Sequence, residues 1–196
     1  MPKRERCEQC LRPQSHCYCP LITKVDSLWP VQILQHPQEA KHALGTARIA
    51  ALCLNNCQLE IASSQFENFI HSLVQPALIY PGVDSKPLET LIGTRPRPLL
   101  FLDATWRKSR RFLLESPALA SLPQYSLASP PASRYRIRRE PEPEALSTLE
   151  AIVHSLALLE ANSEKFAPLL HIMDSLVDEQ ITQMGTAVYA RNYEKN

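Results

Sequence analysis

The chain has 196 residues, 44% of them hydrophobic, and a formal net charge of +1, which suits one globular domain with a small appendage. It has only four glycines and none of the glycine-rich motifs that cradle phosphates, which argues against a Rossmann or P-loop nucleotide site. No apolar run approaches the ~18 residues that a membrane-spanning helix needs, and the N-terminus lacks the apolar stretch of a signal peptide, so we expect a cytoplasmic protein with no membrane partner.

The charges are distributed unevenly along the chain. From residue 91 to 139, ten Lys and Arg stand against two acidic residues, whereas from 140 to 196 ten Asp and Glu stand against three basic residues. A basic block of this kind suggests a polyanionic partner. The alternative is that the two blocks neutralise each other across the fold.

Four of the six cysteines lie near the N-terminus: Cys7, Cys10, Cys17 and Cys19. In a reducing compartment this C-x2-C-x6-C-x-C spacing predicts a metal site in place of disulfides. Zinc prefers four thiolates in a tetrahedral array, and four protein ligands leave no open position, so the zinc would be structural. His16 could replace one cysteine, although its neighbour Cys17 fits better. We expect a zinc-binding segment at residues 1–28 and the main domain at 29–196.

The rest of the chain alternates between short strands and helices. Strands are predicted at 30–35, 58–63, 77–81, 98–103 and 124–128, and alternating side chains add another at 133–140. Helices are predicted at 40–54, 87–92, 144–160 and 164–184, with one more directly after the strand that ends at residue 103. This alternation predicts an α/β fold with a mainly parallel sheet. Cys53 and Cys57 lie at helical spacing and are interpreted as core residues.

The most apolar predicted strand ends at Asp103, and Thr105, Trp106 and a group of cations follow at once. The cations are Arg107, Lys108, Arg110 and Arg111. Asp103 could simply cap the next helix, which is a common role for aspartate. In parallel sheets, however, ligands gather at the C-terminal ends of strands, and these cations cover more than one helical face. The motif therefore favours a ligand site beside a polyanion surface.

Each of three other short motifs has both a purely structural and a functional interpretation. "HPQE" (36–39) and "YPG" (80–82) follow predicted strands, and "LSTLEA" (146–151) lies at the start of a helix. His36 could be an ordinary loop histidine and Gly82 only a turn, while Ser147 and Glu150 fit a capping box. The joint occurrence of these motifs favours a functional site.

Taken in order, the motifs C-x2-C-x-R-P-x3-C-x-C, H-P-x-E, Y-P-G, D-x-T-W, Y-R-x-R and S-T-x-E-A resemble those of the DTW-domain family, from Cys7 to about Leu159. The resemblance is to the bacterial tRNA-uridine aminocarboxypropyltransferases of that family. It implies a SPOUT-like fold, in which a mainly parallel sheet is flanked by helices and a C-terminal trefoil knot holds S-adenosylmethionine (SAM). It also implies transfer of the 3-amino-3-carboxypropyl group of SAM to nitrogen 3 of a tRNA uridine, with the variable loop as the expected location.

The resemblance also suggests roles for individual residues. Asp103 and Trp106 are the expected catalytic residues; Asp103 would hold the methionyl end of SAM or assist deprotonation of uracil, and Trp106 would pack against the transferred group or the base. SAM would be bound by Tyr80, Pro81, Gly82, Leu102, Asp103, Thr105, Leu146, Ser147 and Thr148. The phosphates of tRNA would be bound by His36, Arg107, Lys108, Arg110, Arg111, Arg134, Arg136, Arg138 and Arg139.

Two alternative functions stay open on the sequence alone. The first is a SAM-dependent RNA methyltransferase of the same fold, which would add a group of different mass to the RNA. The second is a non-catalytic, zinc-containing RNA-binding protein, which would bind tRNA but not SAM. In each case we expect a monomeric chain with tRNA as its partner.

Overall fold

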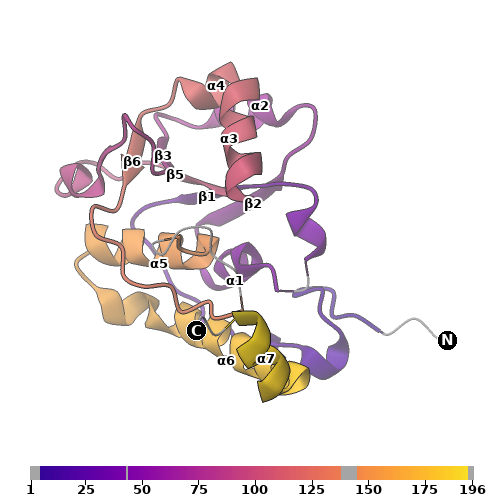
Figure 1. Cartoon of the computed structure of the whole chain (residues 1–196). Coiled ribbons are helices and arrows are strands. Elements are labelled where there is room, and N and C mark those ends of the chain that lie inside the picture. Colours follow the sequence, from indigo (N-terminus) through magenta and orange to yellow (C-terminus); the bar gives the residue numbers. More distant parts are fainter. Residues whose placement is uncertain (1–4, 43, 138–144, 194–196) are drawn as a thin grey trace.

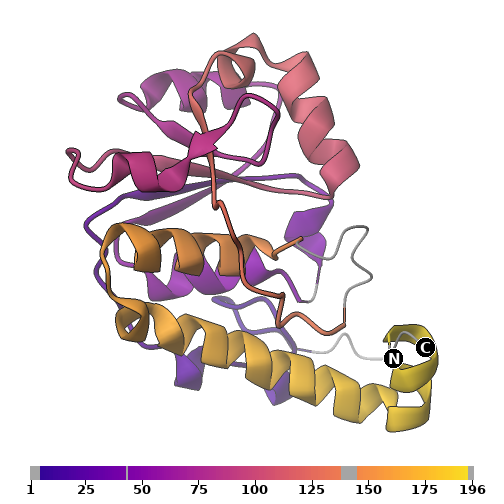
Figure 2. The same ribbon diagram turned by 60° about the vertical axis from the view of Figure 1, so that its left-hand side comes forward.

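The computed structural model describes residues 5–42, 44–137 and 145–193, and it has a parallel sheet between two groups of helices (Figure 1). One face of the sheet is covered by α2 (Phe66–Ser72), α3 (Trp106–Glu115) and α4 (Pro117–Ala120). The other face is covered by α1 (Thr46–Cys53) and α5 (Thr148–Leu159). The long α6 (Ser163–Met184) packs outside α5, and α7 (Thr186–Tyr193) lies at its end (Figure 2). The predicted α/β class is therefore confirmed.

The six strands share one direction. They are β1 (Val31–Gln35), β2 (Cys57–Ile61), β3 (Ala77–Ile79), β4 (Lys86–Pro87), β5 (Leu99–Asp103) and β6 (Gln124–Ser126). Their order is β2-β1-β5-β3-β6-β4, and each pairing between them is parallel. The C-terminal ends of the strands consequently meet at one edge, which we call the carboxyl edge. There Gln35, the last residue of β1, is paired directly with Asp103, the last residue of β5.

Strand β5 lies inside the sheet and is buried on both faces. Leu99 and Phe101 belong to the larger core, which the sheet forms with α1, α5 and α6. Leu100 belongs to the smaller core on the opposite face, where it lies with residues of α2 and α4. Helices on both faces explain why the strand is apolar without alternation.

Several elements differ from the sequence prediction. The helix expected at 40–54 begins only at Thr46, after a 3-10 turn, η3 (Glu39–Lys41). The helix expected at 87–92 is also a 3-10 helix, η4 (Leu88–Leu91). The strand expected at 133–140 is wrong for its described part, 133–137, where the segment lies outside the sheet and reaches α6 through arginine side chains. Sequence patterns do not predict α2, α4 and α7, each of eight residues or fewer.

The N-terminal segment packs onto the body of the protein. It contains two 3-10 turns, η1 (Gln14–His16) and η2 (Cys19–Leu21), and Val25 forms a bridge with Leu54. Cys7, Cys10 and Val25 are buried in the larger core. The division at residues 28 and 29 stays a prediction, but the two parts share one core. Within the described ranges, no helix has both the length and the apolar character that crossing a bilayer requires.

Candidate active site and cysteine cluster

The side chain of Asp103 joins three elements at the carboxyl edge. It is only 8% exposed, its Oδ2 accepts a hydrogen bond from Gln35 Nε2 at 2.8 Å, and its Oδ1 accepts one from Thr148 Oγ1 at 2.6 Å. The N-cap residue of α3 is Thr105, which makes no capping bond with its side chain. The capping interpretation of Asp103 is therefore wrong. Its carboxylate instead connects β1 and β5 to the start of α5.

Two cavities adjoin beside this aspartate, where they share Ala104 and Thr148. The first, of about 230 Å³, is lined by Ile79, Tyr80, Pro81, Phe101, Leu102, Ala104, Trp106, Ser109, Ser126, Leu127, Ala128, Pro130, Ala145, Leu146, Thr148 and Ala151. The second, of about 530 Å³, is lined by Glu39, His42, Leu44, Gly45, Thr46, Asp103, Ala104, Thr105, Tyr135, Ile137, Ser147, Thr148, Gln180, Met184 and Tyr193. Ala104 and Thr148 line both cavities, whereas Trp106 lines only the first and Asp103 only the second.

The residues expected to bind SAM divide between the two cavities. The lining of the first cavity includes Tyr80, Pro81, Leu102, Leu146 and Thr148. The lining of the second includes Asp103, Thr105, Ser147 and Thr148. The rings of Tyr80 and Trp106 meet edge to face with 5.9 Å between centroids, so they form one aromatic wall. Gly82 is not among the lining residues; a Cβ there would lie 2.5 Å from Gln124 Oε1, so its role in the structure is a close approach to that side chain.

A fully buried carboxylate holds the start of α5 against the segment before it. Ser147 and Glu150 form the predicted capping box, with Ser147 N donating to Glu150 Oε2 at 2.8 Å. Glu150 also accepts hydrogen bonds from Arg134 N at 2.5 Å and from the hydroxyl of Ser133. The capping box is therefore confirmed, but it is only part of the role of Glu150. The same carboxylate fixes residues 133–134 beside the two cavities.

Of the six described Lys and Arg residues expected on the RNA surface, four have acidic partners within the chain. Arg134 pairs with Asp174 and Arg136 with Asp178, while Lys108 Nζ lies 2.7 Å from Glu39 Oε1 and Arg111 Nε lies 2.7 Å from Glu115 Oε1. The basic and acidic blocks thus neutralise each other in part. Arg107 and Arg110 are exposed and form no ion pair with the described residues. Arg138 and Arg139 lie outside the described ranges.

His36 lies beside α3 with its ring 5.6 Å from that of Phe112. Burial, followed by the charge of Lys108, lowers the pKa of His36 below its ordinary value. Its Nδ1 accepts a hydrogen bond from Gln38 N at 3.2 Å. His36 therefore lies next to α3, beside the expected RNA surface.

The four N-terminal cysteines gather into one cluster. Their sulfur atoms all lie within 4.8 Å of one another, with Cys7 and Cys19 at 3.6 Å and Cys10 and Cys17 at 3.8 Å. A zinc–sulfur tetrahedron with bonds of ~2.3 Å has edges of ~3.8 Å, so the cluster fits such an ion. Backbone N–H groups of Cys10 and Gln9 lower the pKa of Cys7 to about 6, which favours its thiolate, whereas burial raises the pKa of Cys19, a thiol that a bound metal would have to deprotonate.

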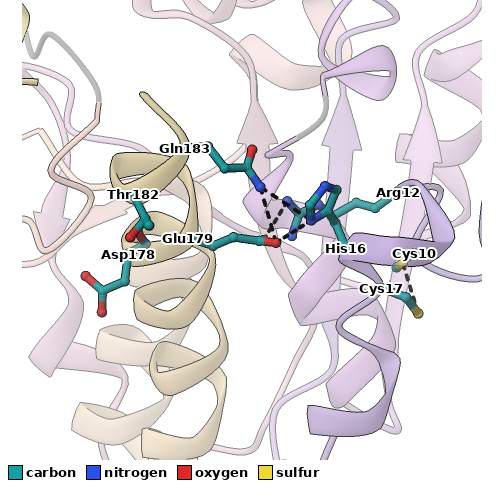
Figure 3. Close-up of polar contacts among 8 residues, drawn as sticks. All are labelled: Cys10, Arg12, His16, Cys17, Asp178, Glu179, Thr182 and Gln183. Atoms are coloured by element: carbon teal, nitrogen blue, oxygen red, sulfur yellow. Dashed lines mark hydrogen bonds and ion pairs between the residues drawn. The ribbon is translucent and has the colours of Figure 1, made fainter. Parts of the chain in front are cut away.

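His16, the alternative metal ligand, contacts Glu179 of α6 (Figure 3). Its Nδ1 lies 2.5 Å from Glu179 Oε1 on α6, and Arg12 Nη2 donates to the other oxygen of that carboxylate at 2.9 Å. Gln183 approaches the same carboxylate (Figure 3). These contacts fasten the cysteine segment to α6.

Cys53 and Cys57 belong to the core, as the sequence predicts. Cys53 is fully buried, and Cys57 packs against the larger core. Burial raises the pKa of Cys53 to about 11 and that of Cys57 to about 12. Among the described residues, the N-terminal cysteines form the only group of three or more His, Cys, Asp or Glu side chains arranged to hold a metal ion.

Comparison with known proteins identifies the family. The model of the DTW domain matches residues 4–181. The chain belongs to the DTW-domain family. Similar proteins include tRNA-uridine aminocarboxypropyltransferase 2 of Drosophila melanogaster (34% identical; 91% of this chain, 76% of the relative) and of Mus musculus (27%; 97% and 68%). Another is tRNA-uridine aminocarboxypropyltransferase A of Arabidopsis thaliana (24%; 89% and 80%). No solved structure matches this chain.

The DTW-domain match ends before the C-terminal elements do. The end of α6 and all of α7 lie beyond residue 181, yet Met184 and Tyr193 line the second cavity. Sequence reasoning did not identify Tyr193, Gln180 or Gln35 as residues of the site. In the sequence, Gln35 is recognisable as a polar residue at the end of a predicted strand, where parallel sheets bind ligands. Nothing in the local sequence pattern marks Tyr193.

Proposed function

We propose that this DTW-domain protein transfers the 3-amino-3-carboxypropyl group of SAM to nitrogen 3 of a tRNA uridine, in the variable loop. The proposal is supported most directly by the named activity of the relative that is 34% identical over 91% of the chain. Two adjoining cavities with a shared wall agree with a reaction between two substrates. A tRNA substrate also agrees with the cytoplasmic location expected from the sequence.

SAM supplies a carbon that is activated by its sulfonium group. The N3–carbon bond forms as the carbon–sulfur bond breaks, the sulfur keeps the electron pair and leaves as methylthioadenosine, and uracil loses its N3 proton. The chain contributes mainly position, because the two reacting atoms must meet at the correct distance and angle. Tyr80 would hold the adenosyl part of the donor in the first cavity, and Trp106 in the same lining would pack against the aminocarboxypropyl group that is transferred. Asp103 would orient the methionyl end or accept the N3 proton.

The direct test is nucleoside mass spectrometry of unmodified tRNA after incubation with the protein and SAM. We expect a uridine that carries the mass of one aminocarboxypropyl group. A uridine that gains only a methyl group would identify a methyltransferase of the same fold. A protein that binds tRNA but neither binds SAM nor alters the tRNA would be the non-catalytic RNA-binding protein.

We also propose the C-terminal trefoil knot that the resemblance implies. The cavities are lined by segments distant in sequence, including the ends of β3 and β5, the region after β6 and the start of α5. Glu150 ties two of these segments together, which agrees with a threaded arrangement. The knot would shape the SAM site through backbone loops, without a glycine-rich phosphate cradle.

We propose that the cysteine cluster holds one structural zinc ion. Protein purified without chelator should contain one zinc per chain, and Cys10→Ser should lose it because one of four thiolates is gone. The N-terminal segment should loosen while the α/β body stays folded, which amide hydrogen exchange would detect. Cys53→Ser, a change in a core cysteine outside the cluster, should keep the zinc. Metal-free protein in elemental analysis would contradict the assignment.

We propose that Arg107 and Arg110 contact tRNA phosphates. Each contact releases counterions, so tRNA affinity should fall with salt at a log–log slope of ~0.7–0.9 per phosphate contact. Changing both to Ala should flatten the slope by roughly one to two units and leave SAM affinity unchanged. Arg95→Ala with Arg97→Ala is the matched control, because this pair lies before β5, at the opposite edge of the sheet. Equal effects of the two double variants would place the RNA elsewhere.

A further inference from the structure

We propose that the second cavity receives the target uridine, with its base stacked on Tyr193 of α7 and its N3 edge directed toward Asp103. The proposal rests on the proposed function and deepens it, because it assigns the two substrates to separate cavities. It also gives a role to α7, which lies beyond the residues that match the family model.

The linings of the cavities separate a donor side from an acceptor side. Among its described lining residues, the first cavity has no charged side chain and contains the aromatic pair Tyr80 and Trp106. An apolar slot of this kind suits an adenosyl group. The second cavity contains the carboxylates of Glu39 and Asp103 and is the larger of the two. Since Thr148 lines both, the two substrates would meet beside its hydroxyl, which donates to Asp103.

The polar groups of the second cavity match the edge of uracil. Uracil presents one N3–H donor between two carbonyl acceptors. Asp103 offers a carboxylate toward the donor, while Gln180 and Thr105 line the same cavity and carry groups that can donate to carbonyls. Cytosine has an unprotonated N3, so its lone pair would face the carboxylate. The site should therefore favour uridine over cytidine.

The placement of Tyr193 depends on a sharp change of direction after α6. Gly185 has a φ of 83°, a left-handed conformation that glycine adopts without strain, and α7 turns away from the axis of α6 at this point (Figure 2). The ring of Tyr193 stacks on Tyr189 with 5.7 Å between centroids and 25° between planes. Tyr193 therefore has a ring partner on its own helix and also lines the second cavity.

The rim of the second cavity adjoins the basic helix. Glu39 lines the cavity and pairs with Lys108 of α3, one residue after Arg107. A tRNA whose phosphates contact α3 could therefore present one extruded base to the cavity. Stacking of a base on an aromatic side chain contributes ~1–3 kcal/mol, which corresponds to a ~5- to 150-fold effect on binding.

The test compares Tyr193→Ala, Tyr193→Leu and Tyr193→Phe in single-turnover transfer at subsaturating tRNA. Because Phe keeps the ring, it should transfer near the wild-type rate, whereas Ala and Leu should each transfer at least about 5-fold more slowly. Leu retains apolar packing, so a slow Leu variant with a normal melting temperature separates stacking from folding. SAM affinity should be unchanged in all three variants. Tyr189→Ala, in the neighbouring ring that does not line the cavity, should have the smaller effect.

A photoreactive thiouridine at the target position provides a second readout that does not require turnover. We expect its crosslink in the α7 peptide that contains Tyr193. Crosslinking to other segments, or wild-type transfer by Tyr193→Leu, would overturn this inference and leave the proposed function intact. A wild-type protein that transfers nothing would instead refute the proposed function.

Discussion

Replacing Asp103 with Asn is expected to lower the rate of aminocarboxypropyl transfer at least about 100-fold, because the carboxylate is lost where uracil must give up a proton. Asn has nearly the same shape but replaces one acceptor oxygen with a donor. In the structure both oxygens accept hydrogen bonds, from Gln35 and from Thr148, so the amide cannot satisfy both contacts in the same way. The cost in folding free energy should be about 1–3 kcal/mol, small enough to leave the protein folded.

Three measurements on the same samples separate these effects: thermal melting, SAM binding and single-turnover transfer. Thr148→Ser is the matched control, since serine keeps the hydroxyl that donates to Asp103, and it should transfer near the wild-type rate. If Asp103→Asn transfers normally, the carboxylate has only a structural role at the carboxyl edge and the catalytic assignment is wrong.

Replacing Glu150 with Leu is expected to lower the free energy of unfolding by about 3 kcal/mol or more, because one buried and two part-buried donors would lose a charged acceptor. Ser147 N and Arg134 N both donate to this carboxylate, and the Glu150 side chain is fully buried. SAM affinity should fall as well, since the segments that Glu150 holds lie beside both cavities. Glu150→Gln should have a smaller effect because one amide oxygen remains an acceptor.

Urea unfolding measures this loss, and Glu164→Leu is the matched control. Glu164 lies exposed in the first turn of α6, so the same change in charge and size occurs there without buried partners. If Glu150→Leu lowers the free energy of unfolding no more than Glu164→Leu does, the hydrogen bonds by which Glu150 joins residues 133–134 to α5 contribute little to stability.

The sequence predicts the strand end that carries the candidate site, but not the contacts made there. The apolar run before Asp103 predicts a buried strand, and the rule for parallel sheets places its end beside ligands. The partner Gln35 is 68 residues away, and only the pairing of β1 with β5 brings it to Asp103. Local patterns contain no information on that pairing, which depends on the packing of the whole sheet.

The charge pattern likewise does not predict contacts between residues that are distant in the sequence. Arg134 and Arg136 belong to a basic block that predicts a polyanion surface, but each pairs with an aspartate of α6 about 40 residues later in the chain. The alternation of their side chains predicts a strand, whereas the segment crosses to α6 outside the sheet. Side chains also alternate in an extended segment that contacts a helix on one side. The alternation therefore does not distinguish a strand of the sheet from such a segment.

Transfer of the aminocarboxypropyl group is tested most directly with SAM that carries one label in the carboxyl carbon of its methionyl arm and a different label in its methyl group. After a single turnover with unmodified tRNA, we predict that the carboxyl label is in the tRNA and the methyl label is in methylthioadenosine. The Asp103→Asn protein should bind the same SAM but transfer little of either label. Methyl label in the tRNA, without the carboxyl label, would show methyl transfer and contradict the proposed transfer of the aminocarboxypropyl group.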